Sequence, residues 1–218
     1  TNYSITIEGL SKIINDIPIL NNITVNFEKG KIYGIVGKNG SGKSMFFKAI
    51  CGLINKTSGS IKVLDNSIEN GYFAKDVGII IESPGFLPQY SAFNNLKILA
   101  SINNKINDND IINAISLVGL NPYDKKEVKK YSLGMKQKLG IAQAIMENQK
   151  IIILDEPTNG IDRSGLKDVH EIIKEEKNKG KIILLASHDL DDSKLLCDKI
   201  YFIENGRVKD FLTEISND

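Results

Sequence analysis

Apolar residues recur along this chain with two different periods. Residues 3–10 and 19–27 alternate between apolar and polar side chains, as half-exposed strands do. Short apolar runs predict further strands at 32–36, 61–64, 77–81, 150–155, 181–186 and 199–203. A turn at 204–207 with Asn-Gly at its centre predicts that a hairpin follows the last of these runs.

Helical spacing fills the intervals between these strands. It predicts helices from about 42 to 50, from Ser132 to about 148, at 164–179 and at 190–197. Residues 92–118 hold helical patterns with no strand between them, so we expect 86–133 to be a small inserted helical subdomain. Because apolar strands alternate with helices, the sequence predicts a single α/β domain over 1–218. Its mostly parallel sheet would be flanked by helices and preceded by an N-terminal antiparallel β part.

Segment 37–44 carries the first chemical signal. Its sequence, Gly-Lys-Asn-Gly-Ser-Gly-Lys-Ser, fits the pattern G-x-x-x-x-G-K-[ST] of a phosphate-binding (P-loop) motif between a strand and a helix. Glycines let backbone N–H groups wrap phosphates, and the helix N-terminus points its positive dipole end at them. Lys43 would neutralise phosphate oxygens, and the Ser44 hydroxyl would ligate Mg²⁺. A glycine-rich turn without a ligand is the alternative. The expected nucleotide contacts are Gly37, Asn39, Gly40, Ser41, Gly42, Lys43 and Ser44.

Two acids and a histidine stand at the ends of later strands. Asp155 would hold magnesium at the carboxyl end of the sheet, and Glu156 would polarise an attacking water. His188 ends another apolar run, where a neutral imidazole could donate to a γ-phosphate. Alone, the acid pair would fit a helix cap and the histidine a structural role. Beside the P-loop, we expect Glu156 and Lys43 to be catalytic, whereas His170 is expected at the surface.

Composition narrows the possible partners. The chain is 41% hydrophobic and 25% charged with a formal net charge of +1, which is typical of an ordinary globular protein. It has no broad positive field for nucleic acid or an anionic membrane, and Arg163 and Arg207 are its only arginines. No apolar run approaches the length of a membrane span, so we expect membrane contact only through a partner.

Two smaller features of the composition have simple interpretations. Cys51 and Cys197 lie far apart in the sequence and suit a reducing cytosol, where we expect both to be packing residues. A lysine cluster at 125, 126, 129 and 130 is expected to be a solvated helix face, with a patch that contacts phosphate or lipid as the alternative.

Taken together and in this order, the motifs resemble those of the ATP-binding cassette family. Ser132-x-Gly134 is similar to its LSGGQ signature, and segment 159–162 to its D-loop ending in Asp162. Segment 187–189 is similar to its switch histidine, which implies that His188 is catalytic. The resemblance implies an ATPase that uses ATP and Mg²⁺. It also implies that two cassettes, as a homodimer or a heterodimer, enclose two ATP molecules. Each ATP would touch the P-loop of one subunit and Ser132 and Gly134 of the other, at a helix N-terminus suited to anions.

The sequence departs from the family pattern at three places. The signature has Leu133 in place of a glycine and Met135 in place of a glutamine. Ile14 stands where an aromatic residue usually stacks on adenine, which removes about 1 kcal/mol of base affinity. Glu82 occupies the position of the family's glutamine in the loop after 77–81, where we expect it to be a magnesium ligand.

These observations favour a transporter motor. The segments 82–88 and 132–137 resemble the branch that serves bacitracin- and lantibiotic-type peptide export and self-immunity, although similar variants could also occur in multidrug exporters generally. The resemblance implies transmembrane permease subunits as partners and a cytoplasmic location at the inner face of the cell membrane. A soluble cassette acting on a macromolecule would need a second cassette, a coiled-coil insertion, a basic face or a cysteine cluster. A P-loop kinase would leave Ser132-x-Gly134 and His188 unexplained.

Overall fold

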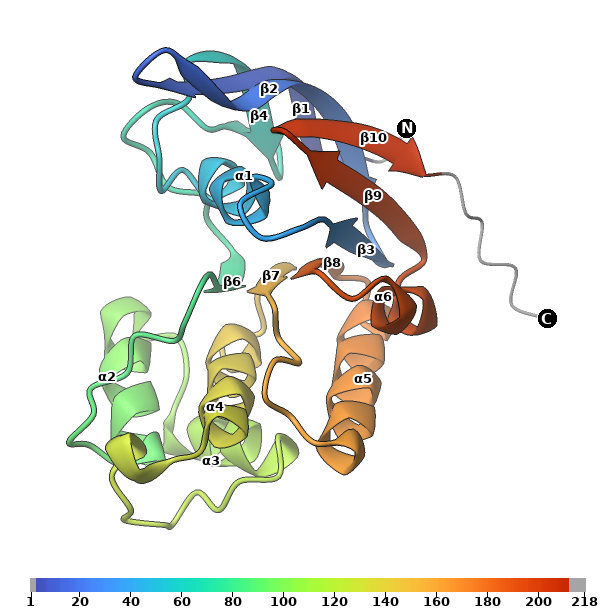
Figure 1. The fold of residues 1–218 in the computed structure, drawn as a ribbon. Helices are drawn as coiled ribbons and strands as arrows, with labels where there is room; N and C mark the ends of the chain where they lie inside the picture. Colours follow the sequence, from blue (N-terminus) through green and yellow to red (C-terminus); the bar gives the residue numbers. More distant parts are fainter. Residues whose placement is uncertain (1–2, 212–218) are drawn as a thin grey trace.

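The computed structural model describes residues 3–211, which form two sheets and the helices packed on them (Figure 1). One sheet is antiparallel with strand order β2-β1-β4-β5, and the other has the order β10-β9-β3-β8-β7-β6. The strands are β1 (Tyr3–Ile14), β2 (Ile17–Glu28), β3 (Lys31–Val36), β4 (Ser58–Val63), β5 (Asn66–Ser67), β6 (Val77–Ile80), β7 (Ile151–Asp155), β8 (Ile182–Ser187), β9 (Lys199–Glu204) and β10 (Arg207–Phe211). The helices are α1 (Lys43–Ile50), α2 (Ala92–Asn103), α3 (Asp108–Leu117), α4 (Leu133–Ile145), α5 (Arg163–Asn178) and α6 (Leu190–Leu196).

Strands β9, β3, β8, β7 and β6 pair in parallel, and β10 adds an antiparallel edge. The mostly parallel sheet and the separate N-terminal antiparallel sheet are therefore as the sequence predicted. Asn205 and Gly206 both have positive φ, at 50° and 70°, and they close the predicted hairpin between β9 and β10.

The parallel sheet buries side chains on both faces, and each face belongs to a different core. In β7, Ile151 and Ile153 pack with α1 and the antiparallel sheet, whereas Ile152 and Leu154 pack with the helices on the other side. This division follows from the period of two along a strand. It also explains why the central strands read as continuous apolar runs. Figure 1 shows α1 between the two sheets and α4 and α5 across the parallel sheet from it.

The helical segment lies between β6 and α4. Ser91 accepts a hydrogen bond at the N-terminus of α2, and Asn107 and Asp110 form a reciprocal capping box on α3. The apolar residues of both helices join the same core as those of α4. The division of 86–133 as a subdomain stays a prediction.

Three local predictions are refined or corrected by the structure. The lysine cluster is exposed, but only Lys129 and Lys130 are helical, in the single 3₁₀ turn Val128–Lys130. Cys51 and Cys197 are both buried, and burial raises the pKa of each thiol to about 12. His170 was expected at the surface, and that expectation is wrong: its side chain is buried on the core side of α5.

Within residues 3–211, none of the helices is both long and apolar enough to cross a membrane.

Gly78 of β6 should be intolerant of a side chain, because an added Cβ would overlap the carbonyl oxygen of Ala144 in α4. We expect Gly78→Ala to lower the free energy of unfolding by about 1–3 kcal/mol, as overpacking in a core does. That loss corresponds to a melting temperature lower by several degrees, at about 2–4 °C per kcal/mol. Gly85→Ala is the matched control, since nothing lies within 4 Å of its added Cβ. Equal melting temperatures for the two variants would contradict the packing argument.

Candidate nucleotide-binding and catalytic site

The P-loop runs from the end of β3 to the start of α1, and two glycines determine its shape. Gly42, just before the helix, has φ of 110°, a conformation that favours glycine, and no side chain caps α1 there. A Cβ on Gly37 would lie 2.6 Å from Ser41 Oγ and closer still to the carbonyl oxygen of Ile203. The loop can therefore keep this tight path only with glycine at both positions.

Lys43 is 6% exposed and points back into the P-loop. Its ammonium donates to the carbonyl oxygens of Gly37 at 2.6 Å and Lys38 at 3.2 Å. The chain thus holds this cation at the centre of the loop, at the place where the sequence predicted phosphate oxygens.

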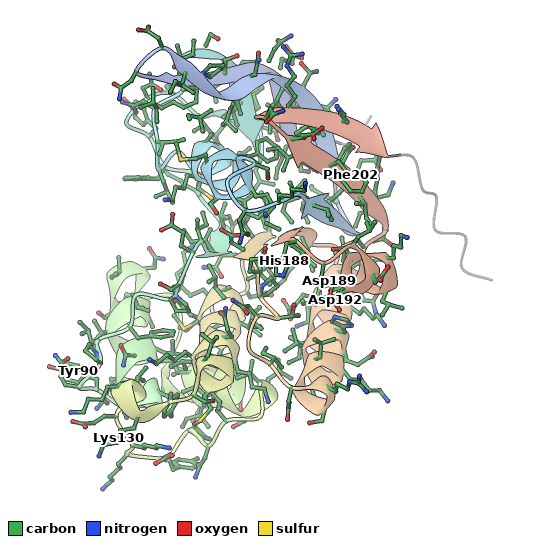
Figure 2. All side chains as sticks on the ribbon, in the orientation of Figure 1. Tyr90, Lys130, His188, Asp189, Asp192 and Phe202 are labelled. Atoms are coloured by element: carbon green, nitrogen blue, oxygen red, sulfur yellow. The ribbon has the colours of Figure 1, made fainter. Side chains whose placement is uncertain are left out.

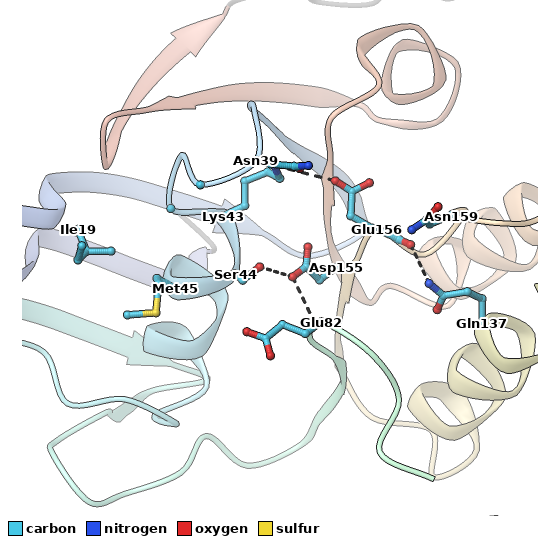
Figure 3. Close-up of a pocket in the computed structure, with 12 residues that line it drawn as sticks. Ile19, Asn39, Lys43, Ser44, Met45, Glu82, Gln137, Asp155, Glu156 and Asn159 are labelled. Carbon is cyan, nitrogen blue, oxygen red and sulfur yellow. Dashed lines mark hydrogen bonds and ion pairs between the residues drawn. The ribbon is translucent and has the colours of Figure 1, made fainter. Parts of the chain in front are cut away.

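Ser44 and Asp155 meet across the site. The Ser44 hydroxyl donates to Asp155 Oδ2 at 2.5 Å, and the backbone N–H of Glu82 donates to the same oxygen at 3.4 Å (Figure 3). A hydroxyl and a carboxylate are hard oxygen donors that suit Mg²⁺, which keeps several waters and takes few protein ligands. Among the described residues, no group of three or more His, Cys, Asp or Glu side chains is placed to hold a metal. The residues fit magnesium bound by Ser44 and Asp155 and completed by water and phosphate.

Glu82 borders the same cavity but directs its carboxylate elsewhere. Its Oε1 lies 2.6 Å from the Nζ of Lys48, which projects from α1. The residue has φ of 65°, so the chain turns sharply where β6 ends. The structure thus brings Glu82 next to Asp155, while its role as a metal ligand stays a prediction.

Glu156 follows Asp155 and stands between two cationic or ionisable groups. Its Oε2 is 3.0 Å from the Nδ1 of His188, and its Oε1 is 4.0 Å from the Nζ of Lys43. A carboxylate can only accept, so His188 must carry its proton on Nδ1 to make this hydrogen bond. A neutral imidazole then leaves Nε2 as an acceptor. In this arrangement, donation by His188 to a phosphate would require the imidazolium form or release of Glu156.

A cavity of about 350 Å³ joins Lys43, Ser44, Asp155 and Glu156, whereas His188 does not line it (Figure 3). Besides residues from the P-loop, it is lined by Ile19, Met45, Glu82, Gln137, Asp155, Glu156 and Asn159. Within the described chain, Oε1 of Glu156 and Oε1 of Gln137 are buried without a hydrogen-bond partner. Buried acceptors without donors carry a free-energy cost, which bound water or a hydrated ligand would remove.

Some predicted contact residues lie outside this cavity. Ile14 is 40% exposed at the tip of the β1–β2 hairpin, whereas Ile19 of β2 lines the cavity. Ser132 caps α4 by accepting from the N–H of Met135 at 3.2 Å, and Asp162 caps α5 by accepting from the N–H of Gly165 at 2.9 Å. These caps are intact, and the predicted contacts of both residues with a second subunit's ATP stay predictions.

The signature and D-loop segments touch each other within one subunit. A Cβ on Gly134 would lie 2.7 Å from the carbonyl oxygen of Gly160, so glycine at 134 allows α4 to approach the D-loop. The D-loop is thus packed between the signature helix and the strand end that carries Glu156.

His170 is linked to the loop after Glu156 through Asp192. Its Nε2 lies 2.9 Å from Oδ1 of Asp192 on α6, and the other carboxylate oxygen of Asp192 accepts from the hydroxyl of Thr158 at 3.4 Å. Figure 2 shows Asp192 and Asp189 near His188, whereas Tyr90 and Lys130 lie at the far edge of the helical segment. A histidine within an amphipathic helix gave no signal of this contact, because its partner is distant in the sequence.

Sequence reasoning also missed Gln137, Lys48 and Ile19. Of these three, only Gln137 could have been found from the sequence. It lies three residues after Gly134, so a helix places both residues on the same face. The contact of Lys48 with Glu82 depends on how β6 ends and could not be derived from spacing.

Comparison with known proteins agrees with this geometry. Residues 20–159 match the family described as "ABC transporter". The chain is 47% identical over 206 residues to an uncharacterized ABC transporter ATP-binding protein, YybJ of Bacillus subtilis, covering 94% of each chain. It is 40% identical over 202 residues to the lantibiotic transport ATP-binding protein SrtF of Streptococcus pyogenes, covering 93% of this chain and 87% of SrtF.

A solved structure described as the ATP-binding subunit of an ABC transporter superposes with a TM-score of 0.84 at 26% identity. The match covers 94% of this chain and 88% of that one. The predicted fold class and family resemblance are confirmed by these findings.

The exposure of Ile14 and the presence of Ile19 lead to a prediction on base selectivity. Neither side chain offers a ring for stacking, so discrimination between purine bases should be weak. We expect GTP to support hydrolysis within about tenfold of ATP, since about 1 kcal/mol of stacking corresponds to less than a tenfold difference. Steady-state hydrolysis rates with ATP and with GTP, measured for the natural sequence and for Ile14→Tyr, give this selectivity. A hundredfold preference for ATP in the natural sequence would show that another side chain stacks on the base.

Proposed function

This chain belongs to the ABC transporter family, and we propose that it is the ATPase subunit that drives export of lantibiotic-type peptides or similar hydrophobic compounds. As a family member it is an ATP-binding and ATP-hydrolysing transporter subunit. The narrower proposal on the exported compound is supported by the resemblance to SrtF, the lantibiotic transport ATP-binding protein of Streptococcus pyogenes. Such export would give self-immunity or resistance to the cell.

The observation that carries the catalytic part of the proposal is the position of Glu156. Its carboxylate stands at the carboxyl end of the parallel sheet, between Lys43 and His188, and faces a cavity with Ser44 and Asp155 at its other side. A carboxylate at this position can orient and deprotonate water, while Lys43 neutralises charge on the phosphate that is transferred. Magnesium, held by Ser44 and Asp155, would supply further charge neutralisation.

The proposal includes a second cassette and a permease. Ser132 and Gly134 begin a helix whose N-terminal N–H groups suit an anion, yet they lie outside the cavity of their own P-loop. A second cassette facing the P-loop would bring its Ser132 and Gly134 to the nucleotide, so ATP would become part of the dimer interface. The pair would bind transmembrane permease subunits at the inner face of the cell membrane.

Replacement of the proposed base tests the catalytic assignment. In Glu156→Gln, we expect ATP turnover to fall by at least about a hundredfold, because the amide cannot take a proton, while ATP binding persists. The stalled variant should also dimerise when ATP and Mg²⁺ are added. Phosphate release, ATP affinity and sedimentation with and without nucleotide provide the three measurements. Turnover within a fewfold of the natural sequence would contradict the role of Glu156, and a monomer unaffected by ATP would contradict the dimer.

Glu82 allows a test of coupling to export. In Glu82→Ala we expect ATP affinity to stay within a fewfold, since the P-loop contacts remain, whereas resistance to a lantibiotic is lost in cells that also express the permease. Glu82→Gln should keep part of both activities, because its carbonyl can still reach a metal. Lys48→Met serves as the control for loss of the ion pair alone. Full resistance in Glu82→Ala would remove this residue from the coupling mechanism.

A further inference from the structure

Gln137 is a buried amide that the mechanism above does not use. It lies in the second turn of α4, is 4% exposed and borders the cavity beside Asp155 and Glu156. Its Nε2 donates to the backbone carbonyl oxygen of Glu156 at 3.3 Å (Figure 3). That oxygen can only accept, so the amide orientation follows from the contact. No hydrogen bond reaches its Oε1 in the described chain.

A half-satisfied buried amide is unfavourable compared with an apolar side chain of the same size. The part of α4 that follows Gln137 consists mostly of apolar core residues, among them Leu139, Ile141 and Ala142. Packing alone would therefore favour leucine or methionine at position 137. The contact with Glu156 is what an apolar residue could not provide.

Glu156 needs an external restraint because its backbone is strained. Its φ is 49°, in the left-handed backbone region that residues other than glycine and asparagine rarely adopt. Its N–H donates to Ala186 at 2.9 Å, and its carbonyl oxygen accepts from the N–H of Asn159 at 3.2 Å. Within residues 3–211, Gln137 is the one side chain that donates to this carbonyl, and it comes from a different element. These bonds fix the peptide after Glu156 and so fix the direction of its carboxylate.

From these contacts we infer that Gln137 is a positioning residue: its amide holds the backbone of Glu156 in the conformation that aims the carboxylate between Lys43 and His188. The inference rests on the proposed role of Glu156. It extends that role to α4, which Ser132 caps and whose first turn holds Gly134. Gly134 and Gln137 lie on one face of α4. Gly134 lies against Gly160 in the D-loop, and Gln137 contacts Glu156, so this face of the helix packs along the loop that joins the two residues. A shift of the signature segment would reach Glu156 through this helix.

The chain offers a matched control in Gln149. This residue is also a buried amide with an unpartnered Oε1, but its Nε2 donates to Glu147, and it does not line the cavity. Replacement by methionine keeps the length of either side chain and removes the donor. Gln137→Met and Gln149→Met therefore differ chiefly in the contact with Glu156.

In Gln137→Met we expect kcat to fall by about ten- to a hundredfold, the size of effect that misplacement of a reacting group produces. ATP affinity should change by less than about threefold, because the P-loop and Ser44 are untouched, and Gln149→Met should keep its kcat. The second variant, Gln137→Glu, keeps the volume, but its carboxylate cannot donate to the carbonyl, so its kcat should fall as well. Melting temperatures and ATP titrations identify any variant that fails to fold.

A double-mutant cycle separates positioning from packing. If Gln137 acts through Glu156, then Gln137→Met should cause no further loss in the Glu156→Gln background, measured as the residual single-turnover rate. A kcat within twofold of the natural sequence in Gln137→Met, or losses that multiply independently in the double variant, would overturn the inference. An equal loss in Gln149→Met would do the same. Normal turnover in Glu156→Gln would instead show that the proposed base is wrong.

Discussion

The parallel pairing of β3, β8 and β7 is the constraint on which the site depends. Its register places Val36 beside Ser187 and Asp155 beside Ala186, so the three strands end at one edge of the sheet. The P-loop, the acid pair and His188 each begin where one of these strands ends. Backbone pairing thus brings residues that are far apart in the sequence to one edge of the sheet. The two cores pack against both faces of the sheet, so its polar side chains are directed to this edge.

Strained backbone marks the same edge. Glu82 and Glu156 both have positive φ and line the cavity, Glu156 directly after β7 and Glu82 two residues after the end of β6. Such conformations cost about 1–3 kcal/mol each and persist only where neighbours hold them. Glu156 is held by Ala186, Asn159 and Gln137, and the N–H of Glu82 by Asp155. At both positions the chain leaves a mainly apolar strand through a left-handed residue, and that residue is acidic.

Much of this site could be predicted from the sequence, because its parts are local. Each of these parts depends on residues close to it in the sequence: the P-loop glycines, the apolar run ending at Asp155 and the serine that caps α4. The loop conformations could not be predicted in this way. Asn15 and Asp16 form a tight turn with φ of 48° and 64° that joins β1 and β2 into one long hairpin, so the predicted strands 3–10 and 19–27 were too short. An Asn-Asp pair tolerates this conformation but also occurs in open loops. His170 and Gln137 were missed because their partners lie 22 and 19 residues away, across separate elements.

The pairing of Glu82 with Lys48 shows why the site can hold so many acids beside a negatively charged ligand. Asp155 and Glu156 are each close to a donor from α1, through Ser44 and Lys43, and Glu82 meets Lys48 one turn further along that helix. One helix thus supplies a hydroxyl and two cations to three carboxylates. The pair of Lys48 with Glu82 is the most exposed of these contacts, and an exposed ion pair contributes only about 0–1 kcal/mol. Glu82 can therefore leave Lys48 for another cation at small free-energy cost, whereas Lys43 and Asp155 are buried and remain in place.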